Sequence, residues 1–210
     1  MTDAGAVFVF GASGHSKVII DAIERAAAGR IVLICDDAPE KHGTRLMGYP
    51  VGSRDELLAR RSEASRGVVG IGDNAIRVRV AAWLREQGCE LMTVIHPAAS
   101  IARDVEIESG TVVMAGCVVN SGTRLGSNVI LNTGATVDHD CNIGEGVHIA
   151  PGSHLCGGVC VGSGTLIGAG STIIPGVRVG SGALIGAGST VLDDVPDGAR
   201  AAGRPCRRLT

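Results

Sequence analysis

The stretch LNTGATVDHDCNIGEGVHIAPGSHL, residues 131–155, repeats a pattern that is six residues long. Every sixth position holds an aliphatic side chain: Leu131, Val137, Ile143, Ile149 and Leu155. The same spacing continues without interruption from Ile95 to Val191. Because side chains alternate along a strand, each aliphatic residue shares its face with the compact residue two places before it, and the residue between them points outward. The pattern predicts one short strand in every six residues.

A second column of residues stands three places after the aliphatic one, from Ala98 to Asp194. Twelve of its seventeen members are glycine, and the others include Asp104, Asn128 and Asp140. These residue types tolerate positive φ, so the column predicts a tight turn after each strand. A strand and a turn every six residues are typical of the hexapeptide-repeat parallel β-helix, in which about three repeats make one triangular coil. The expected fold of this part is an all-β, left-handed parallel β-helix.

The first ninety residues follow a different pattern, in which apolar strands alternate with helices. Four runs are expected strands: AVFVF (6–10), IVLIC (31–35), GVVGIG (67–72) and LMTVI (91–95). Helices are expected at 17–27 and 74–87, and Ser53 opens another with a capping box that includes Glu56. This alternation predicts a small α/β domain with a parallel, Rossmann-like sheet. The expected domains are residues 1–94, the β-helix at 95–195, and a tail at 196–210.

Composition excludes several classes of function. The 210-residue chain has a formal net charge of −2, which gives no basic surface for nucleic acid. No apolar run approaches the roughly 20 residues of a membrane span, and the first ten residues lack the regions of a signal peptide. Seven cysteines without a CxxC pair favour reduced thiols over disulfides or a zinc site. We therefore expect a cytoplasmic protein without a membrane span or a nucleic-acid partner.

The loop from Gly11 to His15 follows the first strand and precedes a helix. Backbone N–H groups and the positive end of the helix at such a place suit a phosphate. The pair Asp36 and Asp37 ends the next strand, where dinucleotide-binding folds carry an acidic residue, and Gly72 stands at a third strand end. The full GxGxxG is absent, so an ordinary strand–helix turn remains the alternative. Ninety residues are also too few for an NAD-dependent reaction.

Three histidines stand close together in the repeat: His139, His148 and His154. Residues eighteen apart stack in successive coils, and none of these pairs has that spacing. A tri-histidine zinc site within one chain is therefore disfavoured and no metal is expected, although ligands from two subunits stay possible. His154 belongs to an outward threonine ladder and is interpreted as a surface residue.

His148 stands in an outward column that is otherwise aliphatic: Val94, Val112, Ile130, Leu166 and Leu184. An outward apolar face needs a partner, which favours subunit packing with threefold symmetry, a homotrimer, and places His148 near a subunit cleft. His139 occupies a turn between the small stacked neighbours Ser121 and Gly157, with Asp140 beside it. A turn histidine next to a carboxylate is a candidate general base, and a plain turn residue is the alternative.

These features together resemble the bacterial sugar acyltransferases of the left-handed β-helix superfamily. The group most similar N-acetylates nucleotide-linked 4-amino sugars, and the sialic acid O-acetyltransferases are related. The resemblance rests on seven motifs: FGASGH (10–15), CDD (35–37), GYPVGS (48–53), IGDNAIR (71–77), IHPAA (95–99), residues 131–153 and AGRPCR (202–207). Cys206 departs from the family, which usually has alanine there.

The resemblance implies a role for each matched residue. His139 would be the general base and Asp140 would raise its basicity, although the family often has Glu there. His148, Ala169 and Ala187 would contact acetyl-CoA, the co-substrate. The nucleotide-linked amino sugar would be bound by six residues: Ser13, Gly14, His15, Asp36, Asp37 and Gly72. His154 has no implied role.

The implied activity is acetyl-CoA-dependent N-acetylation of the 4-amino group of a nucleotide-linked sugar, with a UDP-4-amino-4,6-dideoxy sugar favoured. Such enzymes serve the biosynthesis of cell-surface glycans. A sugar O-acetyltransferase of the sialic acid type and a GDP-perosamine N-acetyltransferase are the enzyme alternatives. A zinc-dependent hydratase and a non-catalytic scaffold are the alternatives outside the transferases.

Overall fold

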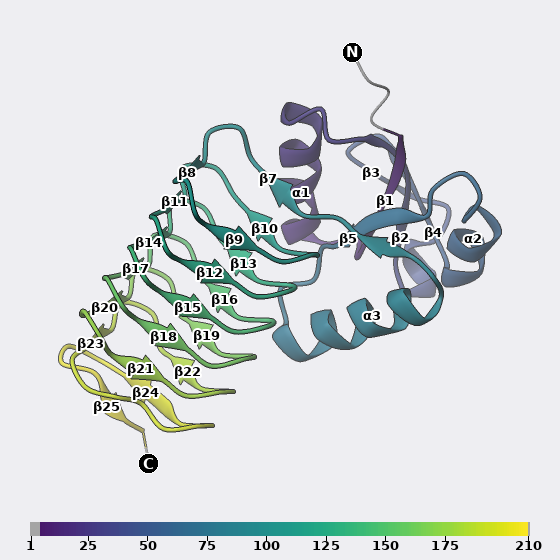
Figure 1. Ribbon diagram of the computed structural model, residues 1–210. Helices are drawn as coiled ribbons and strands as arrows, with labels where there is room; N and C mark the ends of the chain where they lie inside the picture. Colours follow the sequence, from purple (N-terminus) through teal and green to yellow (C-terminus); the bar gives the residue numbers. More distant parts are fainter. Residues whose placement is uncertain (1–4, 210) are drawn as a thin grey trace. The chain divides into compact units, whose positions relative to one another are not determined.

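The computed structural model describes residues 5–209 and divides into two compact units, which meet in the sequence between Pro97 and Ala98 (Figure 1). Residues 1–4, at the start of the expected first domain, and residue 210, at the end of the expected tail, lie outside the described residues. Within the described part, no helix is long and apolar enough to cross a membrane.

The first unit is a mostly parallel sheet with helices, in the strand order β3-β4-β2-β1-β5-β6. Its strands are β1 (Ala6–Phe10), β2 (Arg30–Cys35), β3 (Arg45–Leu46), β4 (Tyr49–Gly52), β5 (Arg66–Val69) and β6 (Glu90–Leu91), with β7 (Val94–Ile95) before the unit boundary. Its helices are α1 (Gly14–Arg25), α2 (Arg54–Ala59) and α3 (Asn74–Glu86), with one 3-10 turn at Pro39–Lys41. The predicted α/β domain is confirmed.

The core of this unit explains why these segments become strands and helices. Val7, Phe8, Val9 and Phe10 of β1 are all buried, as befits a central strand covered on both faces. The predicted capping box is present: Ser53 Oγ accepts from the N–H of Glu56, and the Glu56 carboxylate accepts from the N–H of Ser53. Such a cap stabilises a helix start by about 1 kcal/mol.

Two predictions for this unit are wrong in detail. The expected strand 91–95 is two short strands, β6 and β7, with Met92 and Thr93 between them. The expected strand 67–72 ends at Val69, and the bond from the Gly70 N–H to the Phe10 carbonyl continues the β1–β5 pairing by one residue. The β3–β4 hairpin was not expected, since Gly48 and Pro50 interrupt any alternating pattern there.

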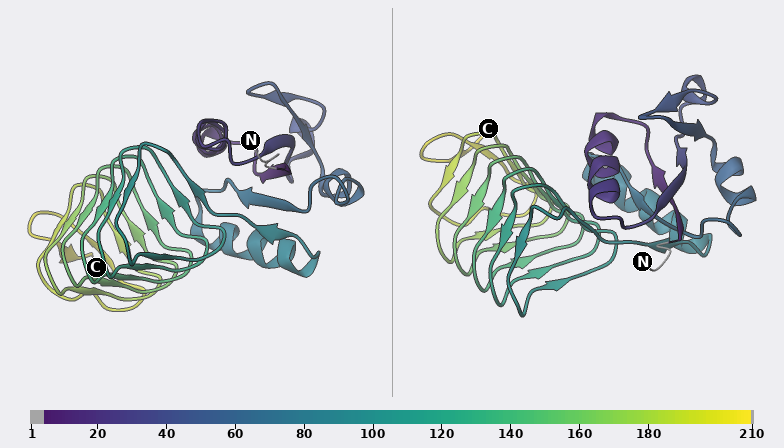
Figure 2. Two further views of the ribbon diagram at one scale, coloured as in Figure 1. Left: turned by 45° about the horizontal axis from the view of Figure 1, so that its top comes forward. Right: turned by 90° about the horizontal axis from the view of Figure 1, so that it is seen from above.

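The second unit is a β-helix whose short parallel strands form three sheets around a triangular coil (Figure 2). We name the sheets after one residue each. The His148 sheet is β10 (Val112–Val113), β13 (Ile130–Leu131), β16 (His148–Ile149), β19 (Leu166–Ile167), β22 (Leu184–Ile185), β24 (Arg200–Ala202) and β25 (Arg207–Arg208). The His154 sheet is β8 (Ser100–Ile101), β11 (Val118–Val119), β14 (Thr136–Val137), β17 (His154–Leu155), β20 (Thr172–Ile173) and β23 (Thr190–Val191). The Cys160 sheet is β9 (Glu106–Ile107), β12 (Arg124–Leu125), β15 (Asn142–Ile143), β18 (Cys160–Val161) and β21 (Arg178–Val179).

The strand register confirms a coil of eighteen residues. Val118 pairs with Thr136, and Thr136 pairs with His154. Every sixth aliphatic residue from Val113 to Val191 is buried inside the coil. The turn column has positive φ at every position from Asp104 to Gly188. The sequence pattern therefore specified both the inner column and the turns.

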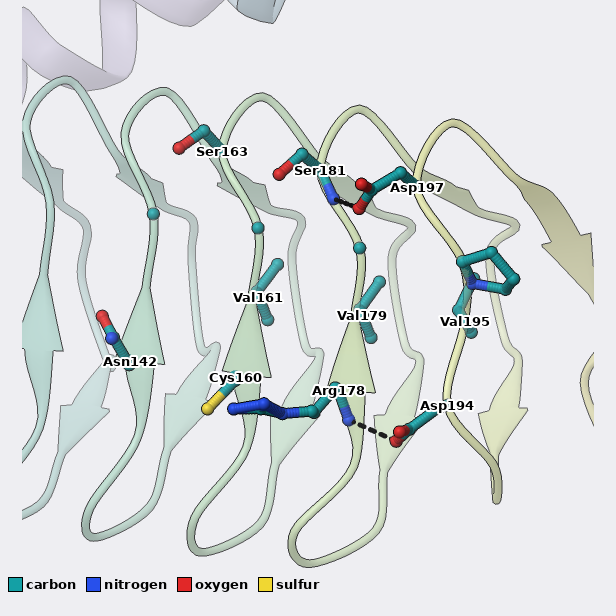
Figure 3. A pocket seen from close by; sticks show the side chains of 14 residues that line it. Asn142, Cys160, Val161, Ser163, Arg178, Val179, Ser181, Asp194, Val195 and Asp197 are labelled. Carbon is teal, nitrogen blue, oxygen red and sulfur yellow. Dashed lines mark hydrogen bonds between the residues drawn. The ribbon is translucent and has the colours of Figure 1, made fainter.

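The C-terminal end of the coil departs from this spacing. Leu184 pairs with Arg200, sixteen residues later, because the chain takes a shorter path after β23. Asp194, expected to be a positive-φ turn, instead accepts the N–H of Arg178 at 2.8 Å, and Asp197 accepts the N–H of Ser181 at 2.7 Å (Figure 3). These carboxylates, together with the backbone pairing of Val195 with Val179, satisfy N–H groups at the end of the Cys160 sheet.

Candidate functional site

The loop after β1 is shaped by a close crossing with the loop after β5. Gly11 has φ +111°, and a Cβ there would lie 3.0 Å from the Gly70 carbonyl oxygen. A Cβ on Gly70 would in turn lie 2.2 Å from Ser16 Oγ. Both glycines are therefore required by the close approach, which brings the carboxyl ends of β1 and β5 together.

The N-terminus of α1 has the features of an anion site. Ser13 has extended backbone at the cap position, and its hydroxyl donates to the Gly70 carbonyl at 3.2 Å instead of accepting from the helix. Within the described residues, no acidic side chain stands in the first turn, which contains Gly14 and His15. The N–H groups and positive dipole end at this turn therefore face no compensating carboxylate from the helix itself.

Asp36 lies at the same sheet edge and ties the loop together. One carboxylate oxygen accepts from Ala12 N at 2.6 Å and from Lys41 Nζ at 3.0 Å, and the other accepts from Ala38 N at 2.9 Å. Burial opposes the charge, but these hydrogen bonds hold the pKa of Asp36 below its usual value. Asp36 therefore acts as an ionised brace for the loop, a role that the sequence pattern did not indicate.

Asp37 is paired with a residue that the sequence reasoning missed. Arg54 donates Nε and Nη2 to the two oxygens of Asp37 at 2.6 and 2.8 Å. This bidentate hydrogen bonding lowers the pKa of Asp37. The guanidinium also lies 4.1 Å from the ring centre of Trp83. The pair forms a charged, stacked surface at the end of β2, where sequence spacing gave no sign of a partner.

Gly72 belongs to a loop that is held by a buried arginine. Arg77 is 1 % exposed, and it donates to the carbonyls of Ile71 and Gly72 at 3.1 and 3.0 Å and to Asn74 Oδ1 at 2.8 Å. Burial lowers the pKa of Arg77 to about 10. Burial, and then the charge of Arg77, lowers the pKa of His15 to about 4, so His15 is neutral at pH 7.

His139 lies at the corner between the His154 sheet and the Cys160 sheet. Its side chain is 63 % exposed, and its Nδ1 is 2.8 Å from Asp140 Oδ2. A carboxylate only accepts, so Nδ1 carries the proton and Nε2 is left as the acceptor. The hydrogen bond to Asp140, and then the charge of Asp138, raises the pKa of His139 above its usual value.

Two glycines make room for this pair. A Cβ on Gly157 would lie 2.5 Å from His139 Nε2, and a Cβ on Gly122 would lie 2.6 Å from Asp140 Oδ1. Asp140 itself has φ +58°, a conformation that few residues other than Gly, Asn and Asp adopt. The predicted slot beside the imidazole is therefore present, with Gly157 as its floor.

Asp138 and Asn120 extend the network and were not predicted. Asp138 Oδ1 accepts from the N–H of His139 at 2.8 Å and from Asn120 Nδ2 at 2.7 Å. Asn120 donates from the preceding coil, eighteen residues earlier. The sequence signal for this contact was the spacing of eighteen between residues 120 and 138, which stacks them in successive coils. The two carboxylates, Asp138 and Asp140, together favour the protonated form of His139.

His148 lies on its own sheet with a defined tautomer. Its Nε2 is 3.1 Å from Asn132 Nδ2, and Asn132 Oδ1 accepts from the N–H of Thr133 at 2.8 Å. This second bond orients the amide, so the amide NH₂ donates to Nε2 of His148. His154 stacks between Thr136 and Thr172, and its Nδ1 is 2.9 Å from Thr136 Oγ1, as the threonine-ladder interpretation expects.

The predicted acetyl-CoA contacts Ala169 and Ala187 are exposed residues at one corner, where the chain leaves the His148 sheet for the His154 sheet. His139 follows β14 of the His154 sheet and precedes β15 of the Cys160 sheet. It therefore lies at a different corner, the one opposite the His148 sheet. One chain therefore cannot bring His139 and His148 to the same point.

Part of the expected outward apolar column is already covered within the single chain. Val94, Val112 and Ile130 are at most 1 % exposed in the single chain. Leu166 and Leu184 are half-buried, so the surface still available for a partner is limited to the coils after His148.

One groove, of about 690 Å³, holds none of the predicted site residues. It follows the Cys160 sheet, and its lining includes Gly144, Gly162, Gly180 and Arg178. Figure 3 shows Arg178 beside Cys160 and Asp194 along this groove. A Cβ at Gly162 would lie 2.4 Å from Ser181 N, so this column must be glycine for successive coils to approach each other here. Elsewhere, no group of three or more His, Cys, Asp or Glu residues is placed for a metal within residues 5–209.

Comparison with known protein families identifies both units. Residues 6–84 match the PglD N-terminal domain. Residues 122–157, 140–174 and 158–193 match the bacterial transferase hexapeptide repeats.

Two solved structures match nearly the whole chain. A perosamine N-acetyltransferase from Caulobacter crescentus, in complex with CoA and GDP-perosamine, is 37 % identical, with a TM-score of 0.93 over 98 % of this chain and 97 % of that one. The acetyltransferase domain of PglB from Neisseria gonorrhoeae FA1090, in complex with acetyl coenzyme A, is 37 % identical, with a TM-score of 0.90 over 97 % of this chain and 98 % of that one.

A third relative is matched over a shorter segment. The UDP-N-acetylbacillosamine N-acetyltransferase of Bacillus subtilis (strain 168) is 34 % identical over 111 residues. That match spans about half of each chain, 52 % of this one and 51 % of the relative. All three relatives are described as acetyltransferases, and two descriptions print a nucleotide-linked sugar: a UDP-linked one for the Bacillus subtilis relative and GDP-perosamine for the Caulobacter crescentus relative.

Proposed function

Since this chain belongs to the left-handed β-helix N-acetyltransferases that act on nucleotide-linked amino sugars, we propose that it transfers the acetyl group of acetyl-CoA to the 4-amino group of a nucleotide-linked 4-amino-4,6-dideoxy sugar. The predicted resemblance and fold class are confirmed by these relatives. The observation that carries the reaction is the hydrogen-bonded pair of His139 and Asp140, an exposed base with a fixed tautomer.

The relatives indicate the class of acceptor, a nucleotide-linked amino sugar, and they leave open whether the nucleotide is UDP or GDP. The Bacillus subtilis relative is named for a UDP-linked sugar, and the Caulobacter crescentus relative binds GDP-perosamine. A UDP-linked sugar was favoured from the sequence, and GDP-perosamine is supported equally by similarity. The shared chemistry, a nucleoside diphosphate joined to a 4-amino sugar, is what we propose for this chain.

The proposed reaction is a direct transfer. The neutral 4-amino nitrogen attacks the thioester carbonyl and forms the C–N bond, while His139 Nε2 accepts the proton that nitrogen loses. Collapse of the tetrahedral intermediate breaks the C–S bond and releases the CoA thiolate, which takes up a proton. Asp140 stabilises the imidazolium that forms on His139. No residue carries the acetyl group, so positioning supplies much of the rate.

The acceptor and the donor are proposed to use separate parts of the chain. The N-terminus of α1, with Ser13, Gly14 and His15, suits the diphosphate because it offers N–H donors beside a neutral imidazole. Asp37 with Arg54, and the loop of Gly72, lie at the same sheet edge and suit the nucleoside. His148, Ala169 and Ala187 are the proposed acetyl-CoA contacts.

We propose that the complete site forms between two copies of the chain in a homotrimer. His139 lies at the corner opposite the sheet that carries His148, so a base and an acetyl-CoA site that meet must come from neighbouring chains. The half-buried Leu166 and Leu184 beside His148 support contact with a second copy on this face.

The decisive experiment is an acceptor panel with acetyl-CoA as donor. UDP- and GDP-linked 4-amino-4,6-dideoxy sugars should be acetylated, free sialic acid should not, and mass spectrometry should locate one acetyl group on the 4-amino nitrogen. His139→Ala should lose most turnover while it still binds acetyl-CoA in a calorimetric titration. Near-normal turnover by His139→Ala, or acetylation of sialic acid alone, would contradict the proposal.

A further inference from the structure

The turn that carries His139 and Asp140 is bridged by a buried hydroxyl from the preceding coil. Thr123 Oγ1 donates to the carbonyl of Asp138 at 2.6 Å and accepts from the N–H of Cys141 at 3.1 Å. Thr123 is 0 % exposed, so its side chain lies inside the coil. A hydroxyl has one proton to donate and lone pairs that accept, so this single group satisfies both ends of the turn.

The same bridge recurs where threonine stands in the inner column, which we define as the residues two places before each buried aliphatic residue. Thr111 donates at 2.7 Å to the carbonyl fifteen residues ahead and accepts at 3.1 Å from the N–H eighteen residues ahead. Thr165 does the same at 2.6 and 3.1 Å. Because the hydroxyl stands between the carbonyl and the N–H, a bridged turn holds these two groups apart.

Turns that follow an apolar residue of the inner column cannot have this bridge. After Val129, the N–H of Val147 donates directly to the carbonyl of Gly144 at 3.4 Å. After Ala135, the equivalent direct bond is 3.3 Å long. The inner residue of one coil therefore decides whether the turn of the next coil is held open by a hydroxyl or closes on itself.

The placement of the proposed base depends on this turn. The side chains of His139 and Asp140 are 63 % and 74 % exposed, so the backbone that carries them decides where they lie. A change from a bridged to a directly closed turn would alter the backbone dihedrals between Asp138 and Cys141. It would thereby disturb the 2.8 Å hydrogen bond between imidazole and carboxylate. A misplacement of about 1 Å can cost about 10²-fold in rate.

We propose that Thr123 is a positioning residue for the acetyl transfer, whose hydroxyl fixes the turn in which His139 and Asp140 are held as a pair. The inference rests on the proposed function, because it takes His139 as the base. It adds a residue inside the coil, which no substrate can reach, to those on which turnover depends. Thr111 and Thr165 form the same bridge but hold turns that carry neither member of the pair.

The test compares Thr123→Val with Thr111→Val, the matched control that removes the same bridge from another turn. Valine is similar in shape to threonine and already occupies the inner column at residue 129, so both variants should fold. Their midpoints of thermal unfolding should fall by similar amounts, because each loses one buried bridge. Only Thr123→Val should lower kcat, by about tenfold to a hundredfold, with the KM values for both substrates within about twofold of the wild type. Thr123→Ser, which restores the hydroxyl, should recover most of kcat.

A second measurement follows the pair without turnover. NMR titration of the His139 imidazole, assigned by the signal that His139→Ala loses, gives its pKa. In the wild type the hydrogen bond to Asp140, and then the charge of Asp138, raises this pKa. Thr123→Val should lower the pKa toward the ordinary value of histidine, because the hydrogen bond that favours the charged ring is disturbed. Thr111→Val should leave it unchanged.

The outcomes separate this inference from the proposed function. Equal losses of kcat in the two valine variants, or an unchanged His139 pKa in Thr123→Val, overturn the positioning role and leave the function standing. A Thr123→Ser variant no more active than Thr123→Val also overturns that role. If Thr123→Val does not fold, Thr123→Ala and Thr111→Ala take the place of the two valine variants, with the same expected results. Wild-type protein that transfers no acetyl group overturns the proposed function itself, and the His139 pKa still tests the bridge.

Discussion

The imidazole of His139 is both exposed and held in place. Asp140 Oδ2 accepts a hydrogen bond from Nδ1–H of His139 at 2.8 Å, and Gly157 leaves space for the ring on its Nε2 side. Asp138 Oδ1 accepts a hydrogen bond from the backbone N–H of His139 at 2.8 Å. In the proposed site, exposure would let a substrate reach Nε2, and the two carboxylates raise the pKa of His139.

This arrangement predicts the effect of Asp140→Asn on the pH dependence of kcat/KM. In the proposed mechanism deprotonated His139 is the base, so kcat/KM should rise with pH through the His139 pKa. Asp140 raises that pKa, so its replacement moves the rise to lower pH. The plateau should also fall, by about tenfold to a hundredfold, because a weaker base loses part of a contribution of about 10²–10⁴.

Asp104→Asn is the matched control for that experiment. Asp104 has φ +62° in the same turn column where Asp140 has φ +58°, and asparagine already occupies this column at residue 128. The control should leave the pH profile unchanged. An Asp140→Asn profile that coincides with the wild type would contradict the assigned role of the pair.

At the scale of one coil, glycine fixes how closely successive turns approach. Gly144, Gly162 and Gly180 stand eighteen apart, and each faces a residue of the next coil. A Cβ at Gly144 would lie 2.7 Å from Ser163 N, and one at Gly180 would lie 2.4 Å from Asp197 N. The requirement is steric, since these glycines are not among those with positive φ.

Gly162→Ala should therefore destabilise the β-helix without touching the proposed site. Its Cβ would lie 2.4 Å from Ser181 N, and overpacking of this kind costs about 1–3 kcal/mol. The midpoint of thermal unfolding, followed by circular dichroism, should fall. Ser163→Ala changes the neighbouring exposed residue of the same turn and should leave the midpoint within a degree or so, since surface substitutions usually change stability by at most about 0.5 kcal/mol. Equal midpoints for the two variants would show that the column tolerates a methyl group.

At the scale of the whole molecule, the triangular coil separates two residues that the proposed reaction would use together. His139 at one corner and His148 on the opposite sheet cannot meet within a chain. Rotational symmetry brings the corner of one copy to the sheet of the next, which is the arrangement proposed above.

Mixed assemblies test this arrangement. His139→Ala chains keep His148, and His148→Ala chains keep His139, so co-expressed chains should form some complete sites. Random trimers of equal amounts contain about one complete site in four, because each site needs one chain of each kind in the right order. Activity should exceed that of either variant alone. A mixture of His139→Ala with His139→Gln is the control and should show no recovery; recovery there, or none in the test mixture, would contradict a shared site.

Predictability from the sequence differed between the two units. The inner aliphatic column, the turns from Asp104 to Gly188 and the slot at Gly157 were all predicted, because each follows from a fixed spacing. In the first unit the strands β1 and β2 and the cap at Ser53 were predicted from local patterns. The β3–β4 hairpin and the division of the last expected strand were not, because neither has a repeating pattern.

The sequence by itself determined the coil and the separation of its histidines. Each coil packs on residues only eighteen positions away. The six-residue repeat in the sequence therefore specifies where the strands and turns of the coil fall. Only the tertiary structure decided that Asp36 braces a loop, that Arg77 is buried beneath Gly72, and that Arg204 reaches the turn at Gly188. These contacts join segments without a common period, and their partners are chosen by burial and by the need to satisfy buried polar groups, which a linear pattern does not contain.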